Sequence, residues 1–226
     1  MPEPSAAAPQ LTPSAAYPPP PTDATAEQQR EYQRGLWNHL LLDDTWRQTR
    51  FNPAPNLLLT ETVGELAPGT ALDVNMGEGR NALHLARLGW QVTGVDIADA
   101  ALRYAQQRAR QLGVALTTIE HDAASFDWGH HCWDLLVLCY ADEQTHAERA
   151  AAALKPGGLV VFENFHYDVN EARKNPPSQQ IGFRTQELPD LYSAAGFRIL
   201  RYEEPVAIAD FSRETQRLVR LVAQKL

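Results

Sequence analysis

The stretch Ala71-Leu-Asp-Val-Asn-Met-Gly-Glu-Gly-Arg-Asn81 decides the fold of this 226-residue chain. Residues 71–75 read as a short apolar strand, and residues 80–88 repeat apolar side chains with helical spacing. Gly77 and Gly79 between them let the backbone turn sharply and approach a ligand closely. The free amides at the start of the following helix present a positive dipole end to that ligand. Strand, glycine loop and helix together predict a nucleotide site in an α/β fold.

Acidic residues accompany three successive predicted strands. Asp73 lies in the first strand, Asp96 follows strand 91–95, and Asp122 follows strand 115–120. Because the carboxyl ends of parallel strands lie at one edge of a sheet, we expect the three acids to converge there. Asp96 is placed to accept both ribose hydroxyls of an adenosine, and Asp122 to reach an adenine amino group.

The loop also fits a second kind of site. Gly77-x-Gly79-x-x-Ala82 matches a dinucleotide fingerprint, which is a weak signal when it stands alone. A pyrophosphate disfavours acids at the loop, and here Asp73 precedes it and Glu78 lies within it. A carboxylate at this place instead suits the ammonium group of a methionine moiety. An NAD-dependent oxidoreductase therefore stays as the less favoured alternative.

Strand and helix patterns alternate along the rest of the chain. This alternation predicts one α/β domain with a mostly parallel sheet and helices on both faces. Residues 43–44 and 51–55 carry loop signals. We expect helices at residues 26–42, 56–66, 80–88, 99–112, 143–154 and 186–195, and strands at residues 71–75, 91–95, 115–120, 133–140, 159–164, 197–203 and 218–224.

The N-terminal segment differs in composition from the rest. Residues 1–25 are rich in Pro, Ala, Ser and Thr, so we expect a disordered or extended tail, with a lid over the site as the alternative. Residues 26–226 are expected to form the domain, with a helical cap at residues 26–66.

Composition excludes several partner classes. The formal net charge is −8 and no basic cluster is present, so neither nucleic acid nor an anionic membrane surface is an expected partner. Two cysteines without metal-type spacing and the absence of a signal-like or membrane-spanning run predict a cytoplasmic protein, as a monomer or homodimer. His130-His131-Cys132 lacks further ligands at suitable spacing, so no metal site is expected.

The run from Ala71 to Asp96 resembles class I S-adenosylmethionine-dependent methyltransferases, and within them the small-molecule branch with tellurite-resistance-type and thiopurine-type enzymes. Leu154-Lys-Pro-Gly-Gly158, the Arg184–Leu200 region and the closing Arg217–Lys225 segment extend the resemblance. It covers the chain from about Trp37 onward. It implies a Rossmann-like, seven-stranded, mostly parallel sheet of order 3-2-1-4-5-7-6 with an antiparallel last strand.

The resemblance also implies a cofactor, S-adenosylmethionine, with S-adenosylhomocysteine as the product. Asn75 stands where these enzymes usually have glycine, and asparagine is the other residue that best tolerates a positive φ. The methionine part is expected near Asp73, Gly77 and Gly79, the ribose near Asp96, the adenine near Asp122 and Ala123, and the sulfonium near Cys139 and Tyr140. The full expected cofactor set is Asp73, Asn75, Gly77, Gly79, Asn81, Asp96, Ile97, Asp122, Ala123 and Cys139.

The methyl acceptor is expected to be a small-molecule nucleophile, attacked at O, N, S or a chalcogen. The alternative is a protein of this fold that binds the cofactor without transferring methyl. His166 and Tyr140 are the candidate catalytic residues; for His166 an exposed loop histidine is the competing interpretation, and His146 is expected to face solvent. Asp142, Glu163 and Tyr167 are further candidates near the strand ends, Trp37, Trp46 and Phe51 are candidate substrate contacts, and Arg47 and Arg50 are either anion ligands or solvated charges.

Overall fold

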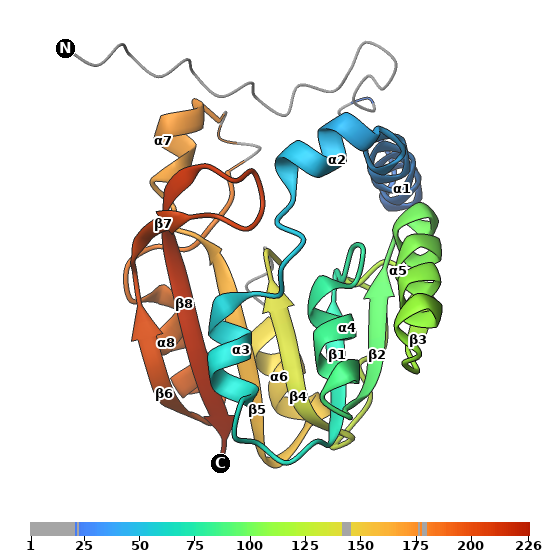
Figure 1. Cartoon of the computed structure of the whole chain (residues 1–226). Coiled ribbons are helices and arrows are strands. Elements are labelled where there is room, and N and C mark those ends of the chain that lie inside the picture. The colour runs from blue at the N-terminus through green and yellow to red at the C-terminus, as the bar shows by residue number, and fades with distance from the viewer. Residues whose placement is uncertain (1–20, 22, 142–145, 176, 178–179) are drawn as a thin grey trace, which may run out of the picture.

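A twisted, mostly parallel sheet forms the centre of the computed structural model, which describes residues 21, 23–141, 146–175, 177 and 180–226 (Figure 1). The strand order is β3-β2-β1-β4-β5-β8-β6, and the short β7 pairs with β8 beside this path. β8 takes the place of the expected seventh strand and runs antiparallel to both β5 and β6. The expected strand order and the antiparallel last strand are therefore confirmed, with β7 as an additional strand. The strands are β1 Thr70–Val74, β2 Gln91–Asp96, β3 Thr117–Glu120, β4 Trp133–Cys139, β5 Leu154–Phe165, β6 Phe197–Glu203, β7 Val206–Ile208 and β8 Thr215–Lys225.

Helices cover both faces of the sheet, as predicted. α3, α4 and α5 pack on one face, and α6 and α8 pack on the other. The Rossmann-like α/β fold class is therefore confirmed. The helices are α1 Ala26–Leu42, α2 Asp44–Arg50, α3 Leu57–Val63, α4 Arg80–Arg87, α5 Asp99–Leu112, α6 His146–Ala153, α7 Val169–Arg173 and α8 Glu187–Ala194.

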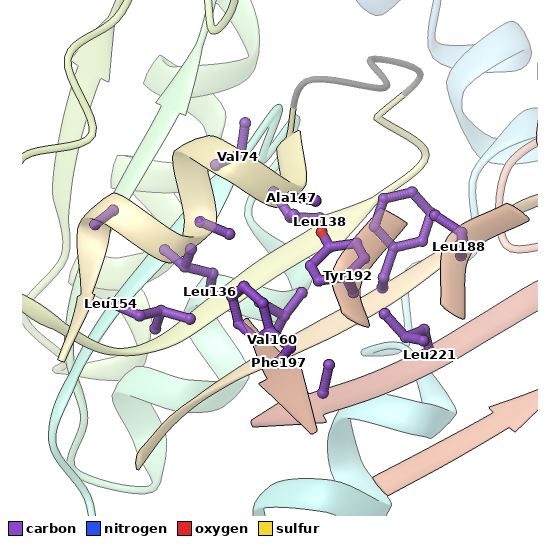
Figure 2. Close-up of a cluster of buried hydrophobic side chains, with 14 of the residues drawn as sticks. Val74, Leu136, Leu138, Ala147, Leu154, Val160, Leu188, Tyr192, Phe197 and Leu221 are labelled. Carbon is purple, nitrogen blue, oxygen red and sulfur yellow. The ribbon is translucent and has the colours of Figure 1, made fainter. Parts of the chain in front are cut away.

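The central strand β4 shows how the sheet divides the core. Side chains alternate between the two faces of a strand, so Leu135 and Val137 pack against α3, α4 and α5. Leu136 and Leu138 belong to the cluster on the opposite face. Figure 2 shows the second cluster, in which side chains of α6 and α8 meet those of β4 and β5. The continuous apolar strand β4 is therefore buried on both faces, as expected for a strand of a parallel sheet.

Three elements lie where the sequence predicted loops. α2 occupies part of the stretch between the first two predicted helices because Asp43 ends α1 and also caps α2, accepting a hydrogen bond from the Trp46 amide at 3.0 Å. α7 and β7 are five and three residues long, too short to show a periodic pattern. β5 begins at Leu154 rather than at the expected Leu159, because Pro156-Gly157-Gly158 continues the strand across a register shift.

The first helices take different places relative to the sheet. α1 packs on α5 through Leu41, and α1 and α2 lie over the carboxyl ends of the strands (Figure 1). α3 instead buries Leu58 and Leu59 in the core. The segment expected to be a tail lies mostly outside the described residues. Among the residues that the structure describes, no helix combines the length and apolarity needed to span a membrane.

Candidate functional site

A cavity of about 880 Å³ lies at the carboxyl edge of the sheet, where the three acids were expected to converge. Its walls come from α1 and α2, the glycine loop after β1, the ends of β2 and β4, and the hairpin between β7 and β8. Twelve of the predicted site residues line it: Trp37, Phe51, Asp73, Asn75, Gly77, Asn81, Asp96, Ile97, Asp122, Ala123, Cys139 and Tyr140.

The glycine loop is held in a left-handed conformation at three positions. The φ angles are 55° at Asn75, 54° at Gly77 and 74° at Gly79. Asparagine therefore occupies the kind of backbone conformation for which its tolerance of positive φ is needed. A Cβ on Gly77 would meet nothing within 4 Å, so this glycine leaves open space above the loop. That space is available to a ligand.

Gly79 has a packing role instead. It is not among the residues that line the cavity. A Cβ at this position would lie 2.8 Å from the Met76 Cε atom and 3.1 Å from the Ala105 Cβ atom. Its expected contact with the cofactor is therefore not part of the geometry, because the loop turns Gly79 towards α5.

Asp96 holds the loop and faces the cavity. Its carboxylate accepts hydrogen bonds from the Gly77 amide at 2.7 Å and the Ala98 amide at 2.8 Å. Burial raises the pKa of Asp96, and these amides oppose the shift. Each carboxylate oxygen retains further acceptor capacity, so the side chain can still bind a hydroxyl.

Asp73 is a buried acid directly beneath the loop. Its Oδ2 atom accepts a hydrogen bond from the Ala82 amide at 3.0 Å. Burial raises the pKa of Asp73 to about 7, and the positive charge of Arg80 opposes the shift. A buried carboxylate favours a cationic ligand, because the positive charge of the ligand would offset the cost of burying the negative charge of the carboxylate.

Asp122 and its neighbours complete the edge after β3. Asp122 Oδ1 accepts a hydrogen bond from the Ala124 amide at 3.0 Å, which fixes the turn that carries Ala123 into the cavity wall. Ile97, after β2, lines the same region. The Asp122 carboxylate, the apolar Ile97 side chain and the backbone of the turn together form a suitable environment for a flat heterocycle with an amino group.

Tyr140 is held in place by two hydrogen bonds at the end of β4. Its hydroxyl donates to Glu163 Oε1 at 2.9 Å and accepts from the Asp210 amide at 2.8 Å. Its φ is 62°, which is unusual for a bulky residue and typical of strained functional positions. Burial and the charges of Glu163 and Asp210 raise the pKa of Tyr140 far above its usual value. This hydroxyl is therefore a poor base, and the geometry suits positioning rather than proton removal.

A buried polar network joins Tyr140 to the last strand. Asn56 Nδ2 donates to Glu163 Oε1 and to Asp210 Oδ2, both at 2.8 Å. Arg220 Nε donates to Glu163 Oε2 at 2.6 Å, and Arg80 forms an ion pair with Asp210 at 2.7 Å. The network ties the start of α3 and α4 to the hairpin before β8. It fixes the cavity wall from segments far apart in the sequence.

Arg47 of α2 closes over the glycine loop. Its guanidinium lies 3.1 Å from Glu78 and 4.4 Å from the centre of the Tyr104 ring. All three residues line the cavity. Arg47 therefore neutralises the acid inside the loop, whereas Arg50 is directed to Glu214 at 3.5 Å and does not line the cavity.

The histidine expectations need correction. His166 does not line the main cavity; it borders a smaller one, with Nε2 3.1 Å from Thr185 Oγ1 and Nδ1 3.1 Å from Asp168. It is also buried, not an exposed loop residue, because β5 extends to Phe165 and carries it towards the core. Its candidate role as the base is thus not supported by its position. Tyr167 borders the same smaller cavity.

His146 was wrongly expected to face solvent. It is buried at the start of α6, packs 5.2 Å from the Trp128 ring and lines the main cavity. Burial lowers its pKa to about 4. Asp142 lies outside the described residues.

Of the three aromatic candidates for substrate contact, two line the main cavity and one does not. Trp37 and Phe51 line the cavity, whereas Trp46 packs behind Phe51 with ring centres 5.3 Å apart. Trp46 thus supports the wall without lining it, because α2 turns the side chain away. Phe211 stands against both Phe51 and Trp37, at 5.3 and 6.0 Å.

Five of the lining residues that were not predicted from the sequence come from three places: one begins α4, one lies in α7 and three lie in the β7–β8 hairpin. They are Arg80, Arg173, Asp210, Phe211 and Arg213. The Gly79-Arg80 pair was visible beside the loop, but residues 210–213 carry no motif. Only the pairing of β7 with β8 places them opposite the cap.

Comparison with known proteins agrees with this geometry. Residues 71–158 match the methyltransferase domain family. The protein-L-isoaspartate O-methyltransferase of Xylella fastidiosa (strain 9a5c) is 32% identical over 114 residues, which are 50% of each chain. This chain thus spans about half the length of the curated relatives it matches.

Two solved structures show the same fold. Magnesium protoporphyrin IX methyltransferase from Synechocystis PCC 6803, with bound S-adenosylhomocysteine, has a TM-score of 0.63 at 17% identity and covers 87% of this chain and 99% of its own. TehB from Haemophilus influenzae has a TM-score of 0.60 at 18% identity and covers 74% of this chain and 61% of its own. Residues 71–158 therefore match a methyltransferase domain, and the two neighbours share the fold of this chain, one of them with bound S-adenosylhomocysteine.

Proposed function

We propose that this chain transfers a methyl group from S-adenosylmethionine to a small-molecule nucleophile. One observation carries the proposal: Asp73, Asp96 and Asp122, from three strand ends, meet the left-handed glycine loop in one cavity. The opening above Gly77 and the acids around it fit a cofactor that carries an ammonium, a sulfonium and an adenosine.

Each part of the cofactor has a matching group in the cavity. Asp73 favours the ammonium and Asp96 the ribose hydroxyls, while Ile97 and the Asp122–Ala124 turn form the adenine wall. Arg80, at the start of α4, is placed to bind the cofactor carboxylate while it remains paired with Asp210. We assign the sulfonium to the region beside Cys139 and Tyr140.

The bound cofactor supplies an electrophilic methyl carbon on a positively charged sulfur. In the transfer, a bond forms between the acceptor atom and this carbon as the carbon–sulfur bond breaks, and the electron pair of that bond stays on sulfur. A protonated acceptor loses its proton to solvent or to a base. The chain contributes alignment, because Tyr140 and the aromatic side chains restrict where the acceptor can lie.

We infer that the acceptor is a small molecule from the volume of the cavity. A volume of about 880 Å³ lies near the upper end of the range for ligand pockets, which extends to about 1,000 Å³. This space suits the cofactor together with one small acceptor. The proposed place of the chain in a tellurite- or thiopurine-type branch rests on its sequence motifs, since the solved neighbours share only the fold.

Isothermal titration with S-adenosylhomocysteine tests the cofactor site. We expect saturable binding, and Asp96→Asn should weaken it by about tenfold or more because a charged acceptor is lost. Asp190→Asn is the matched control, since Asp190 is exposed on α8 and outside the cavity. Absence of binding at millimolar ligand, with the folded state verified by circular dichroism, would refute the proposal.

A second measurement separates catalysis from binding alone. Radiolabelled methyl from S-adenosylmethionine is followed into a broad panel of phenols, amines, thiols, carboxylates and chalcogen oxyanions. Transfer to any acceptor establishes turnover. Tight S-adenosylhomocysteine binding without transfer across the panel would favour a cofactor-binding protein.

A further inference from the structure

The main cavity has two ends that differ in charge. The sheet order places the carboxyl ends of β3, β2 and β1 on one side, and the carboxyl end of β5 with the start of the antiparallel β8 on the other. The first side is the cofactor end, lined by Asp73, Glu78, Asp96 and Asp122. The second side, which we term the acceptor end, is lined by Phe165, Arg173, Ile181, Asp210, Phe211 and Arg213.

Positive charge remains at the acceptor end after its acid is paired. Among the lining residues that the structure describes there, Asp210 is the acid, and Arg80 forms an ion pair with it at 2.7 Å. Arg173 and Arg213 add two further guanidinium groups; Arg173 lies 3.8 Å from Glu214, a carboxylate that also pairs with Arg50 at 3.5 Å, so positive charge still exceeds negative charge here. In a chain with a net charge of −8, this local reversal of sign is a specific feature of the cavity.

Both arginines lie close to the tip of the β7–β8 hairpin. Arg213 is exposed and donates to the Gln48 carbonyl oxygen at 3.4 Å, a neutral acceptor that does not cancel its charge. Arg173 Nη2 lies 3.3 Å from the hydroxyl of Ser212, the residue next to Arg213. The Arg173 guanidinium also stacks 4.5 Å from the centre of the Phe165 ring. Charge and apolar surface therefore lie side by side.

Aromatic rings form the remaining wall of the acceptor end. Phe211 lies 5.3 Å from Phe51 and 6.4 Å from Phe165, measured between ring centres. Tyr140 packs 5.2 Å from Phe165. Such a wall favours a flat apolar body, and the arginines favour an oxyanion attached to it.

We propose that the acceptor end binds a flat, apolar molecule carrying an oxyanion, a carboxylate or a phosphate ester, through Arg173 and Arg213. The identification of this molecule as the methyl acceptor rests on the proposed function. The binding of the anion itself rests only on the cavity.

Matched ligand pairs test the charge requirement by isothermal titration. The probes are 2-naphthoate and 2-naphthyl phosphate, compared with the uncharged 2-naphthalenemethanol. We expect at least one anion to bind about tenfold or more tightly than the alcohol, and the two anions show which oxyanion is preferred. Titrations are run with and without saturating S-adenosylhomocysteine, so a failure of cofactor binding leaves this comparison intact.

Two variants assign the effect to the arginines. Arg213→Met and Arg173→Met should each remove most of the preference for the anion while the alcohol binds as before. Arg198→Met, at an exposed position on β6 outside the cavity, is the control and should retain the preference. Arg213 is exposed, so its variant is expected to fold even if Arg173→Met does not. Equal binding of anions and alcohol, or a preference that survives Arg213→Met, would overturn the proposal.

Discussion

The side chain of Met76 fills the space beside Gly94. A Cβ built on Gly94 would lie 1.9 Å from the Met76 sulfur, closer than any real contact. Met76 is buried, and its amide donates to the Val95 carbonyl oxygen at 3.0 Å. The glycine in β2 thus allows the loop after β1 to lie flat against the neighbouring strand.

Gly94→Ala should therefore destabilise the protein and disturb the loop. We expect a loss of about 1–3 kcal/mol in the free energy of unfolding, measured by chemical denaturation, because overpacking forces the core to shift. The double variant Gly94→Ala/Met76→Ala should recover part of this loss. Gly64→Ala is the control, since its nearest contact would be 3.4 Å. Equal effects of the two glycine substitutions would show that Met76 does not lock the loop.

Asn75 should behave as a residue kept in a left-handed conformation. Its φ of 55° predicts that Asn75→Ala costs about 1 kcal/mol of stability, whereas Asn75→Gly is close to neutral. Thermal unfolding of the three proteins measures the difference. If alanine and glycine were equally tolerated, backbone strain would not be the constraint at this position.

Because the pKa of Asp73 is raised, we expect stability and ligand binding to depend on pH with opposite signs. Burial raises its pKa from 3.8 to about 7, so the folded state holds a proton that the unfolded chain has lost. The contribution of this group to stability therefore falls as the pH rises from 3.8 to about 7, and the penalty is complete above that range. An ammonium ligand prefers the ionised form, so affinity should fall as the pH drops below about 7.

Asp73→Asn tests both signs in one variant. At pH 8 it should raise the free energy of unfolding by on the order of 2 kcal/mol and weaken S-adenosylhomocysteine binding about tenfold. Binding measured from pH 5.5 to 8 should lose most of its pH dependence in the variant. Asp190→Asn should leave both properties unchanged. A wild-type affinity that is constant across this range would contradict the assigned role of Asp73.

Tyr140→Phe separates positioning from proton transfer. The variant loses the hydrogen bonds to Glu163 and to the Asp210 amide, so stability should fall by about 1–2 kcal/mol. Tyr192→Phe is a matched control, because the buried Tyr192 hydroxyl has no hydrogen-bond partner in the part of the chain that the structure describes. Its removal should be neutral or slightly stabilising.

Turnover gives the second readout for Tyr140. A positioning role predicts a modest loss of kcat with an unchanged pH profile. A loss beyond about a hundredfold together with the disappearance of a basic pKa from that profile would instead identify Tyr140 as the base.

The part of the site that a local motif encodes could be predicted from sequence. Asp73, Gly77 and Asp96 lie within or directly after apolar strands, and parallel pairing alone brings strand ends together. Asn75 was expected to tolerate a positive φ, and it adopts one. The strand order followed from the resemblance of the whole domain.

The rest of the site depends on tertiary contacts that no local pattern encodes. His146 and His166 were misplaced because their burial is set by the Trp128 ring and by the extended β5 strand. Asp210 and Arg213 reach the cavity only through the short β7–β8 pairing, which has no periodic signal. α2 was missed because a single aspartate, Asp43, both ends one helix and begins the next.

The contacts between the cap and the β7–β8 hairpin also set the order in which the site can be built. Asn52 bonds to Asp210, 158 positions away in the sequence, and Phe51 forms a bridge with Phe211. The residues that we assign to the ammonium, ribose, adenine and sulfonium of the cofactor lie between residues 71 and 140, so this end can assemble earlier on a growing chain. The acceptor end must await the synthesis of the final hairpin, so a nascent chain acquires a place for the cofactor before it acquires a closed place for an acceptor.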